Sequence, residues 1–241
     1  MVEISTGFQR ARRPEQVEAR RKMILETARA MLREQPVTEI SLRELSNRVG
    51  LARSNVLRYF DSREAIFLEI MDETWRAWLA AVEERLREPA PPDRTLPDRM
   101  PPDRTPPGRF GAEIRVASIV AETVAAQPLL CELISLMAGV LERHISLDCA
   151  RDFKRRAAVN STRLATLVRA ELPQLSEAAA GRFAGAVFIV VAGLWPYATP
   201  TETVVTVIRE MGATHPGETF TEDLRDGLIT QLVGLTVREA G

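Results

Sequence analysis

The clearest periodicity in the chain lies within residues 41–60, where apolar residues recur at helical spacing. Three of them, Leu42, Leu45 and Val49, fall on one face of a short helix. Ser41 precedes this helix as an N-cap, and Glu44 three residues later completes a capping box. Gly50 follows directly, at a point where a change of direction needs a residue that tolerates a positive φ.

A second short apolar stripe follows the glycine and consists of Leu51, Val56 and Phe60. The residues left mainly on the free face of this helix are Arg53, Ser54, Asn55, Arg58 and Tyr59. Arginine can fork onto guanine, asparagine onto adenine, and hydroxyl groups bond phosphate oxygens. Residues 41–60 therefore predict a helix-turn-helix whose second helix, about residues 53–60, enters the major groove of DNA. An ordinary helical hairpin with a solvated polar face is the open alternative.

Helical periodicity continues on both sides of this motif. A preceding helix is predicted over residues 20–32, and a long helix with a continuous apolar stripe over residues 62–87. Further helices are expected at 110–126, 128–144, 147–171, 174–195, 201–211 and 220–238. Prolines 128, 173, 196 and 200 punctuate them, and Pro216 with Gly217 marks a turn. No strand alternation is visible, so the fold class is all-α.

Proline density sets the domain boundaries. Eight of the 21 residues at 89–109 are proline, and Pro-Asp-Arg recurs three times there, so this segment is predicted to be an extended linker. The predicted organisation has a flexible basic arm at 1–17, a DNA-binding head at 18–64, a connecting helix at 65–88, and a ligand-binding and dimerisation domain at 110–241.

Charge supports a DNA-contacting head. Residues 1–60 carry 12 basic and 7 acidic side chains, a net charge of +5, whereas the whole chain has a net charge of −1. A basic head on an acidic body suits a DNA-binding module joined to a domain with another role. The two cysteines, Cys131 and Cys149, form no metal-binding or disulfide pattern.

Location and catalysis are predicted largely from what the sequence does not contain. The N-terminus has no apolar core typical of a signal peptide, and the longest apolar run, residues 183–195, is too short to cross a bilayer. We therefore expect a cytoplasmic protein without membrane contact. No catalytic motif is visible, and the two histidines, His144 and His215, lie 71 residues apart. The sequence thus predicts neither an enzyme, nor a metal site, nor a cofactor.

The run Gly50-Leu51-Ala52-Arg53-Ser54-Asn55-Val56-Leu57-Arg58-Tyr59-Phe60-Asp61-Ser62-Arg63-Glu64-Ala65-Ile66 resembles the tetracycline-repressor (TetR) family of bacterial transcription regulators. The resemblance is specific over about residues 18–78. It implies base contacts from Arg43, Arg53, Ser54 and Asn55. It also implies phosphate contacts from Tyr59, Arg63 and the helix N-terminus at Ser41; Leu57 and Arg58 complete the expected DNA-binding set.

This sequence departs from the family pattern at three positions. Leu57 replaces the usual Tyr, which makes that DNA contact apolar or removes it. Ala52 replaces the usual Ser cap and leaves the second helix of the motif poorly capped. Pro36 replaces a common Gly. None of these changes weakens the prediction of the fold. Because Leu57 alters an expected DNA contact, however, the operator sequence of a relative cannot be assumed for this protein.

The resemblance also implies a homodimer on palindromic double-stranded DNA, because two heads read more base pairs than one. In the family, two long C-terminal helices from each subunit form the interface. Candidate interface residues are Gly181, Gly185, Leu224, Leu228, Leu232 and Leu235. The alternative is that these faces form the core of the monomer.

The remaining helices are expected to enclose a pocket for a small apolar effector. Its candidate lining is Met137, Leu141, His144, Phe153, Phe188 and Trp195. The expected function is a repressor that the effector releases from its operator by a population shift. Two alternatives stay open: a helix-turn-helix regulator without a small ligand, and a helical lipid- or acyl-binding protein that has lost DNA binding.

Overall fold

The computed structural model describes residues 7–89 and 110–240, and side chains from residue 15 onward. The predicted linker at 89–109 lies outside the described residues except for its first residue. Within the described ranges, α-helices and a single π-helix account for the regular structure, and no strand is present. The all-α fold class is therefore confirmed.

The structure divides into two compact units. The first unit combines residues 7–73 with residues 136–155. It contains α1 (Gly7–Leu32), α2 (Leu42–Val49), α3 (Arg53–Val56), the first part of α4 (Arg63–Arg87), the π-helix η1 (Met137–Leu141) and the first part of α7 (Leu147–Glu171). Segment 136–155, which the sequence assigns to the C-terminal domain, thus clusters with the DNA-binding head.

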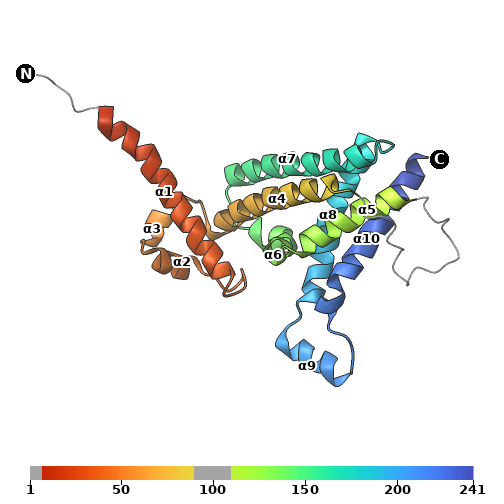
Figure 1. The fold of residues 1–241 in the computed structure, drawn as a ribbon. Helices are drawn as coiled ribbons and strands as arrows, with labels where there is room; N and C mark the ends of the chain where they lie inside the picture. The colour runs from red at the N-terminus through yellow and green to blue at the C-terminus, as the bar shows by residue number, and fades with distance from the viewer. Residues whose placement is uncertain (1–6, 90–109, 241) are drawn as a thin grey trace, which may run out of the picture. The chain divides into compact units, whose positions relative to one another are not determined.

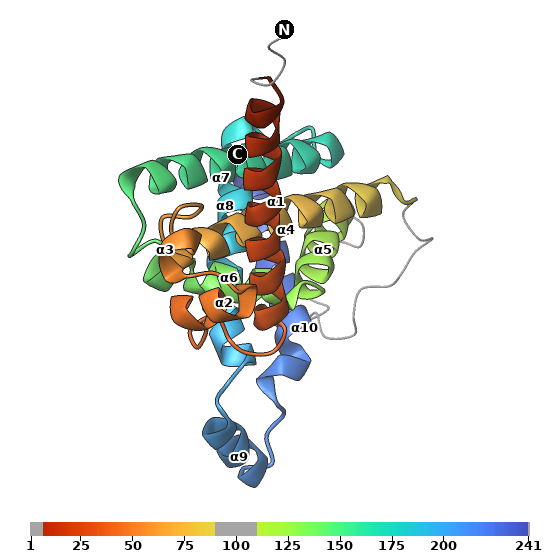
Figure 2. The ribbon, with the colours of Figure 1, turned by 90° about the vertical axis from the view of Figure 1, so that its left-hand side faces the viewer.

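The second unit contains the rest of α4 and α7 together with five further helices. These are α5 (Gly111–Ala125), α6 (Pro128–Leu136), α8 (Glu177–Ala198), α9 (Glu202–Glu210) and α10 (Pro216–Glu239). Helix α10 packs against both α5 and α8, as Figure 1 shows. Figures 1 and 2 both show α9 beyond the ends of α8 and α10, away from the rest of this unit.

Four element boundaries differ from the predictions. Residues 7–17, expected to be a flexible arm, belong to α1. The regular part of α3 stops at Val56, and tight turns carry the chain on to Phe60. Helix α8 continues through Pro196 to Ala198. Pro216 opens α10 rather than a turn, because its missing N–H costs nothing at a helix start, and the His215 ring caps that start by accepting from the Gly217 N–H at 3.0 Å.

Helix α8 is long and apolar enough, by length and composition, to cross a bilayer. The bent pair formed by α5 with α6 and η1 passes the same test jointly, within the described residues. In α8, however, only 39% of the most apolar window is buried inside the chain. One face packs on α10, and the opposite face is left open. Helix α8 is thus a core helix with a second, uncovered apolar face.

Candidate nucleic-acid interface

The turn between α2 and α3 forms as local sequence chemistry dictates. The Ser41 hydroxyl accepts a hydrogen bond from the Glu44 N–H at 3.1 Å and caps α2. Gly50 adopts a left-handed conformation with φ +74°, and its N–H donates to the Asn47 carbonyl oxygen. The Glu44 carboxylate accepts from Gln35 Nε2 at 2.8 Å, so the Glu44 side chain contributes to a contact with the α1–α2 loop.

Helix α3 begins without a side-chain cap. Ala52 occupies the N-cap position in extended conformation and offers no hydrogen bond, as the sequence predicts. Val56 is buried and fixes the inward face of α3, while Arg53, Ser54 and Asn55 are exposed on its first turn. The helix therefore presents these three side chains outward from a buried anchor.

Most remaining members of the expected DNA-binding set are also exposed. Arg43 on α2 and Arg58 after α3 are exposed, Tyr59 is half-buried, and Leu57 is one of the exposed large apolar side chains. Within residues 15–89 and 110–240, the side chains of Arg43, Arg53, Asn55 and Arg58 make no hydrogen bond or ion pair. Three positive charges and one amide are thus available to an external partner.

Other arginines of the same unit are paired internally. Arg21 binds both carboxylate oxygens of Glu69, and its second amino group donates to the Tyr59 carbonyl oxygen at 2.5 Å. Its guanidinium also lies 4.3 Å from the centre of the Phe60 ring. Arg29 pairs with Glu73, and Arg48 pairs with Glu34 at 2.5 Å. These contacts hold α1 against α4 and the turn after α3, and they tie α2 to the loop after α1.

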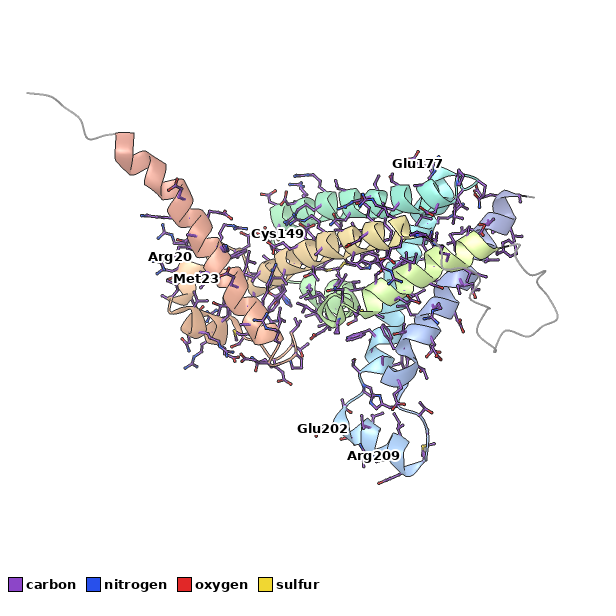
Figure 3. The ribbon with its side chains drawn as sticks, in the orientation of Figure 1. Arg20, Met23, Cys149, Glu177, Glu202 and Arg209 are labelled. Atoms are coloured by element: carbon purple, nitrogen blue, oxygen red, sulfur yellow. The ribbon has the colours of Figure 1, made fainter. Side chains whose placement is uncertain are left out.

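Arg21 is a positioning residue that the sequence analysis missed. It lies four residues before Leu25 and seven before Ala28, both of which are buried, so helical periodicity places it on the inward face of α1. Its neighbour Arg20, which Figure 3 labels, falls outside this periodicity and is exposed. Periodicity could have identified Arg21; composition could not.

Arg63, an expected phosphate contact, is hydrogen-bonded within the head. Its guanidinium donates to the Ile40 carbonyl oxygen at 2.7 Å and to Glu64 Oε1 at 2.8 and 3.1 Å. The ring of Phe67 lies 5.8 Å from it. Because its donors are already engaged within the head, Arg63 fastens the start of α4 to the residue before the α2 cap. These internal bonds favour a structural role for Arg63 over the expected phosphate contact.

A further contact joins segment 136–155 to the head. Ser146 donates from its hydroxyl to Asp61, the residue two before the start of α4. The same hydroxyl accepts from the Cys149 N–H at 3.1 Å and caps α7. The first turn of α7 is therefore held to the loop between α3 and α4.

The six residues predicted to line the effector pocket are divided between the two units. Met137, Leu141, His144 and Phe153 belong to the first unit, where Leu141 and Phe153 are buried and His144 is exposed. Phe188 and Trp195 belong to the second unit. None of the six predicted residues lines the hollow on α10 or the recess beside α9.

Aromatic packing in the second unit contains one unsatisfied polar group. The Phe188 ring lies 4.1 Å from Trp75 and 6.3 Å from Trp78, measured between ring centroids. The Trp78 Nε1–H donates to Thr123 Oγ1 at 3.0 Å. The buried Trp75 Nε1–H, by contrast, has no hydrogen-bond partner in the described part of the chain. Such a group is a place where an acceptor from outside could bind.

The predicted dimer residues fall into two classes. Leu224, Leu228, Leu232 and Leu235 are buried within the protomer, where α10 packs on α5 and α8. This burial favours the alternative reading, in which these leucines form the core of the monomer, over their assignment to the dimer surface. Gly181 and Gly185 lie on the open face of α8.

Over residues 7–89 and 110–240, no group of three or more histidine, cysteine, aspartate or glutamate side chains is placed to hold a metal ion.

Two family models match this sequence in adjacent ranges. The model described as "Bacterial regulatory proteins, tetR family" matches residues 24–70. The model described as "Tetracyclin repressor-like, C-terminal domain" matches residues 72–239. Together they cover the head and the helical body.

Similar curated proteins are the "HTH-type transcriptional regulator EthR" of Mycobacterium tuberculosis, in the CDC 1551 / Oshkosh and H37Rv strains, and its counterpart in Mycobacterium bovis. Each is 32% identical to this chain over 71 residues. The match covers 30% of this chain and 33% of each relative, so the chain matches about a third of the length of these proteins.

Proposed function

Because this chain belongs to the tetR family of bacterial regulatory proteins, we propose that it is a repressor that binds a palindromic operator as a homodimer and is released by a small apolar effector. The family is one of DNA-binding transcriptional regulators with a helix-turn-helix. One observation carries the proposal. Arg43, Arg53, Asn55 and Arg58 are exposed and have no side-chain partner among the described residues, whereas other arginines of the same head are paired.

The proposed DNA contacts follow from side-chain chemistry and position. Arg43, Arg53 and Asn55, with the Ser54 hydroxyl, contact base edges in the major groove. Arg58, Tyr59 and the α2 N-terminus at Ser41 contact phosphates. The exposed Leu57 suits an apolar contact with a thymine methyl group.

The open face of α8 supports the homodimer. Its exposed residues include Gly181, Gly185 and Gly193, and a Cβ atom added at any of them would meet nothing within 4 Å. Glycine inside a helix costs about 0.5–1 kcal/mol relative to alanine. No contact within the described part of the chain requires glycine at these positions, whereas close approach of a partner helix would. We propose that this face of α8 packs against its copy, in place of the α10 leucines.

Effector binding is proposed at the aromatic cluster of Trp75 and Phe188. An effector that carries a hydrogen-bond acceptor would satisfy the buried Trp75 N–H and displace the Phe188 ring. Trp75 lies on α4, which continues from the head into the second unit. A shift of α4 on binding would therefore move the head. The distance between the two heads of the dimer would then no longer fit the spacing of the operator half-sites.

A regulator without a small ligand is a second candidate, favoured by one observation. Leu141, Phe153 and Phe188 are all packed, and neither described hollow contains them. A thermal-shift screen with small apolar acceptors separates the two candidates. A compound that stabilises the wild-type protein but not a Phe188→Ala variant supports the effector; its failure to release operator DNA would favour the second candidate. We place either regulator in the cytoplasm, with its DNA.

Selection from random double-stranded DNA tests the proposed function. The purified full-length protein should enrich an inverted repeat whose half-sites lie about one helical turn, or a multiple of it, apart. Enrichment of one unrepeated half-site would contradict dimeric binding. No enrichment over non-specific DNA would contradict the proposed function as a whole.

A further inference from the structure

Helix α9 is amphipathic, and its apolar face is only partly covered. On a helical projection, Val204, Val205, Val207, Ile208 and Met211, the residue that follows the helix, fall on one arc. The opposite arc carries Glu202, Thr203, Thr206, Arg209 and Glu210. None of the residues of α9 is buried. Figure 3 labels Glu202 and Arg209 on α9, where no other helix of the unit lies alongside.

The exposed part of this face is large for so short a helix. Val204, Val207 and Met211 are 47%, 48% and 75% exposed. An isolated helix of nine residues is marginal in water, and protein helices gain most of their stability from packing an apolar face. Val205 and Ile208 are half-buried, but the described chain leaves Val204, Val207 and Met211 exposed, so α9 would gain stability from a partner outside the chain.

A recess lies beside the same helix. Val205 and Ile208 line it together with the turn at 212–215 and Glu218, and its volume is about 460 Å³. A recess of this size accepts a large side chain. Helix α9 therefore offers both apolar projections and a cavity, as a self-complementary surface requires.

Exposed apolar residues also lie on α8, close in sequence to α9. Ile189 and Tyr197 on the open face of α8 are 74% and 76% exposed, and α8 ends only four residues before Glu202 opens α9. A stable interface needs about 800 Å² from each partner. The glycines of α8 allow close approach but bury little area, so further apolar residues at the edge of this face are needed to reach that size.

We infer that α9 is a dimer clasp, which packs Val204, Val207 and Met211 onto a second copy of this chain beside the α8 interface. The inference rests on the proposed homodimer. By two-fold symmetry, each subunit supplies one α9 and receives the other.

Sedimentation equilibrium of the full-length protein tests the clasp. The wild-type protein should be a dimer, and Ile189→Glu should abolish it. The double variant Val204→Glu with Val207→Glu should raise the dimer dissociation constant at least tenfold, with unchanged helical circular dichroism. Thr203→Glu with Thr206→Glu adds the same charges to the polar face of α9 and should leave the dissociation constant unchanged.

The outcomes separate the two proposals. A monomeric wild-type protein at tens of micromolar would overturn the homodimer and the clasp together. A wild-type dimer whose dissociation constant is unaffected by the Val204/Val207 double variant would overturn the clasp alone. A photo-crosslinking amino acid at position 207 gives a check that does not depend on the variant folding. It should yield a covalent dimer, whereas the same group at position 203 should not; no dimer band from position 207 would contradict the clasp.

Discussion

The guanidinium of Arg63 donates to the main-chain carbonyl oxygen of Ile40 at 2.7 Å. This contact fastens the first residue of α4 to the chain just before Ser41, the N-cap of α2. The helix that runs from the head into the second unit is thereby tied to the helix that precedes the turn of the DNA-binding motif.

Arg63→Ala should therefore destabilise the protein without removing a specific DNA contact. A hydrogen bond from a charged donor contributes about 1.5–3 kcal/mol, and the Glu64 carboxylate would lose its partner as well. We expect the free energy of unfolding to fall by about 2 kcal/mol in urea titrations. At a temperature where the variant stays folded, the salt dependence of DNA binding should match the wild type. A salt slope lower by about one would show that Arg63 holds a phosphate after all.

The buried leucines of α10 give a matched test of core against interface. Leu228→Ala should lower the free energy of unfolding by about 2–5 kcal/mol, as truncation of a buried leucine does. Gly185→Ala should instead leave unfolding of the monomer unchanged or improve it slightly, while weakening the dimer. Urea unfolding at several protein concentrations separates the two effects. A dimer strengthened by Gly185→Ala would contradict close packing at the α8 face.

The two tryptophans of α4 should lose different amounts of stability on the same substitution. Trp78→Phe removes the hydrogen bond to Thr123 and should cost about 1 kcal/mol beyond the lost ring area. Trp75→Phe removes an N–H that has no partner in the described structure. The desolvation penalty of that N–H disappears with it, which should offset much of the stability lost with the smaller ring. Chemical denaturation of both variants is the measurement. Equal losses of stability would mean that the Trp75 N–H is satisfied in solution.

The two cysteines should differ in reactivity. Burial raises the pKa of the Cys131 thiol to about 12, and its Sγ–H donates to the Val124 carbonyl oxygen. Because the thiolate is the reactive form, Cys131 should resist a disulfide reagent at pH 8 and react once the protein is unfolded. Cys149 is half-exposed and should account for labelling of the native protein, which Cys149→Ser should abolish. Rapid labelling of native Cys149→Ser would show that α6 opens readily.

Local chemistry was sufficient to predict much of the fold. The Ser41 cap, the left-handed Gly50 and the uncapped Ala52 each depend on residues within one turn, so the sequence predicts them directly. Pro216 shows the limit of such rules. Proline followed by glycine is common in turns, but proline is equally suited to the first position of a helix, and tertiary context decided between them.

The candidate site was less predictable, because a residue's role there depends on whether its side chain is covered by the same chain or left open to a partner. Periodicity finds the stripe of Leu224, Leu228, Leu232 and Leu235, yet it cannot distinguish a stripe covered by the same chain from one covered by a partner. Family resemblance assigned Arg63 to phosphate, while its donors lie within reach of Ile40 and Glu64. Exposure and pairing, which only the structure provides, made these distinctions.

Asn55→Ala, titrated on the selected operator and its single-base variants at two salt concentrations, tests the central claim most directly. Asn55 is exposed on the first turn of α3, with no side-chain partner in the described structure. If it reads a base, its loss should remove about 1–3 kcal/mol of discrimination at one position of each half-site and leave non-specific binding and the salt slope unchanged. Equal weakening of every sequence would contradict the proposed docking of α3 in the major groove.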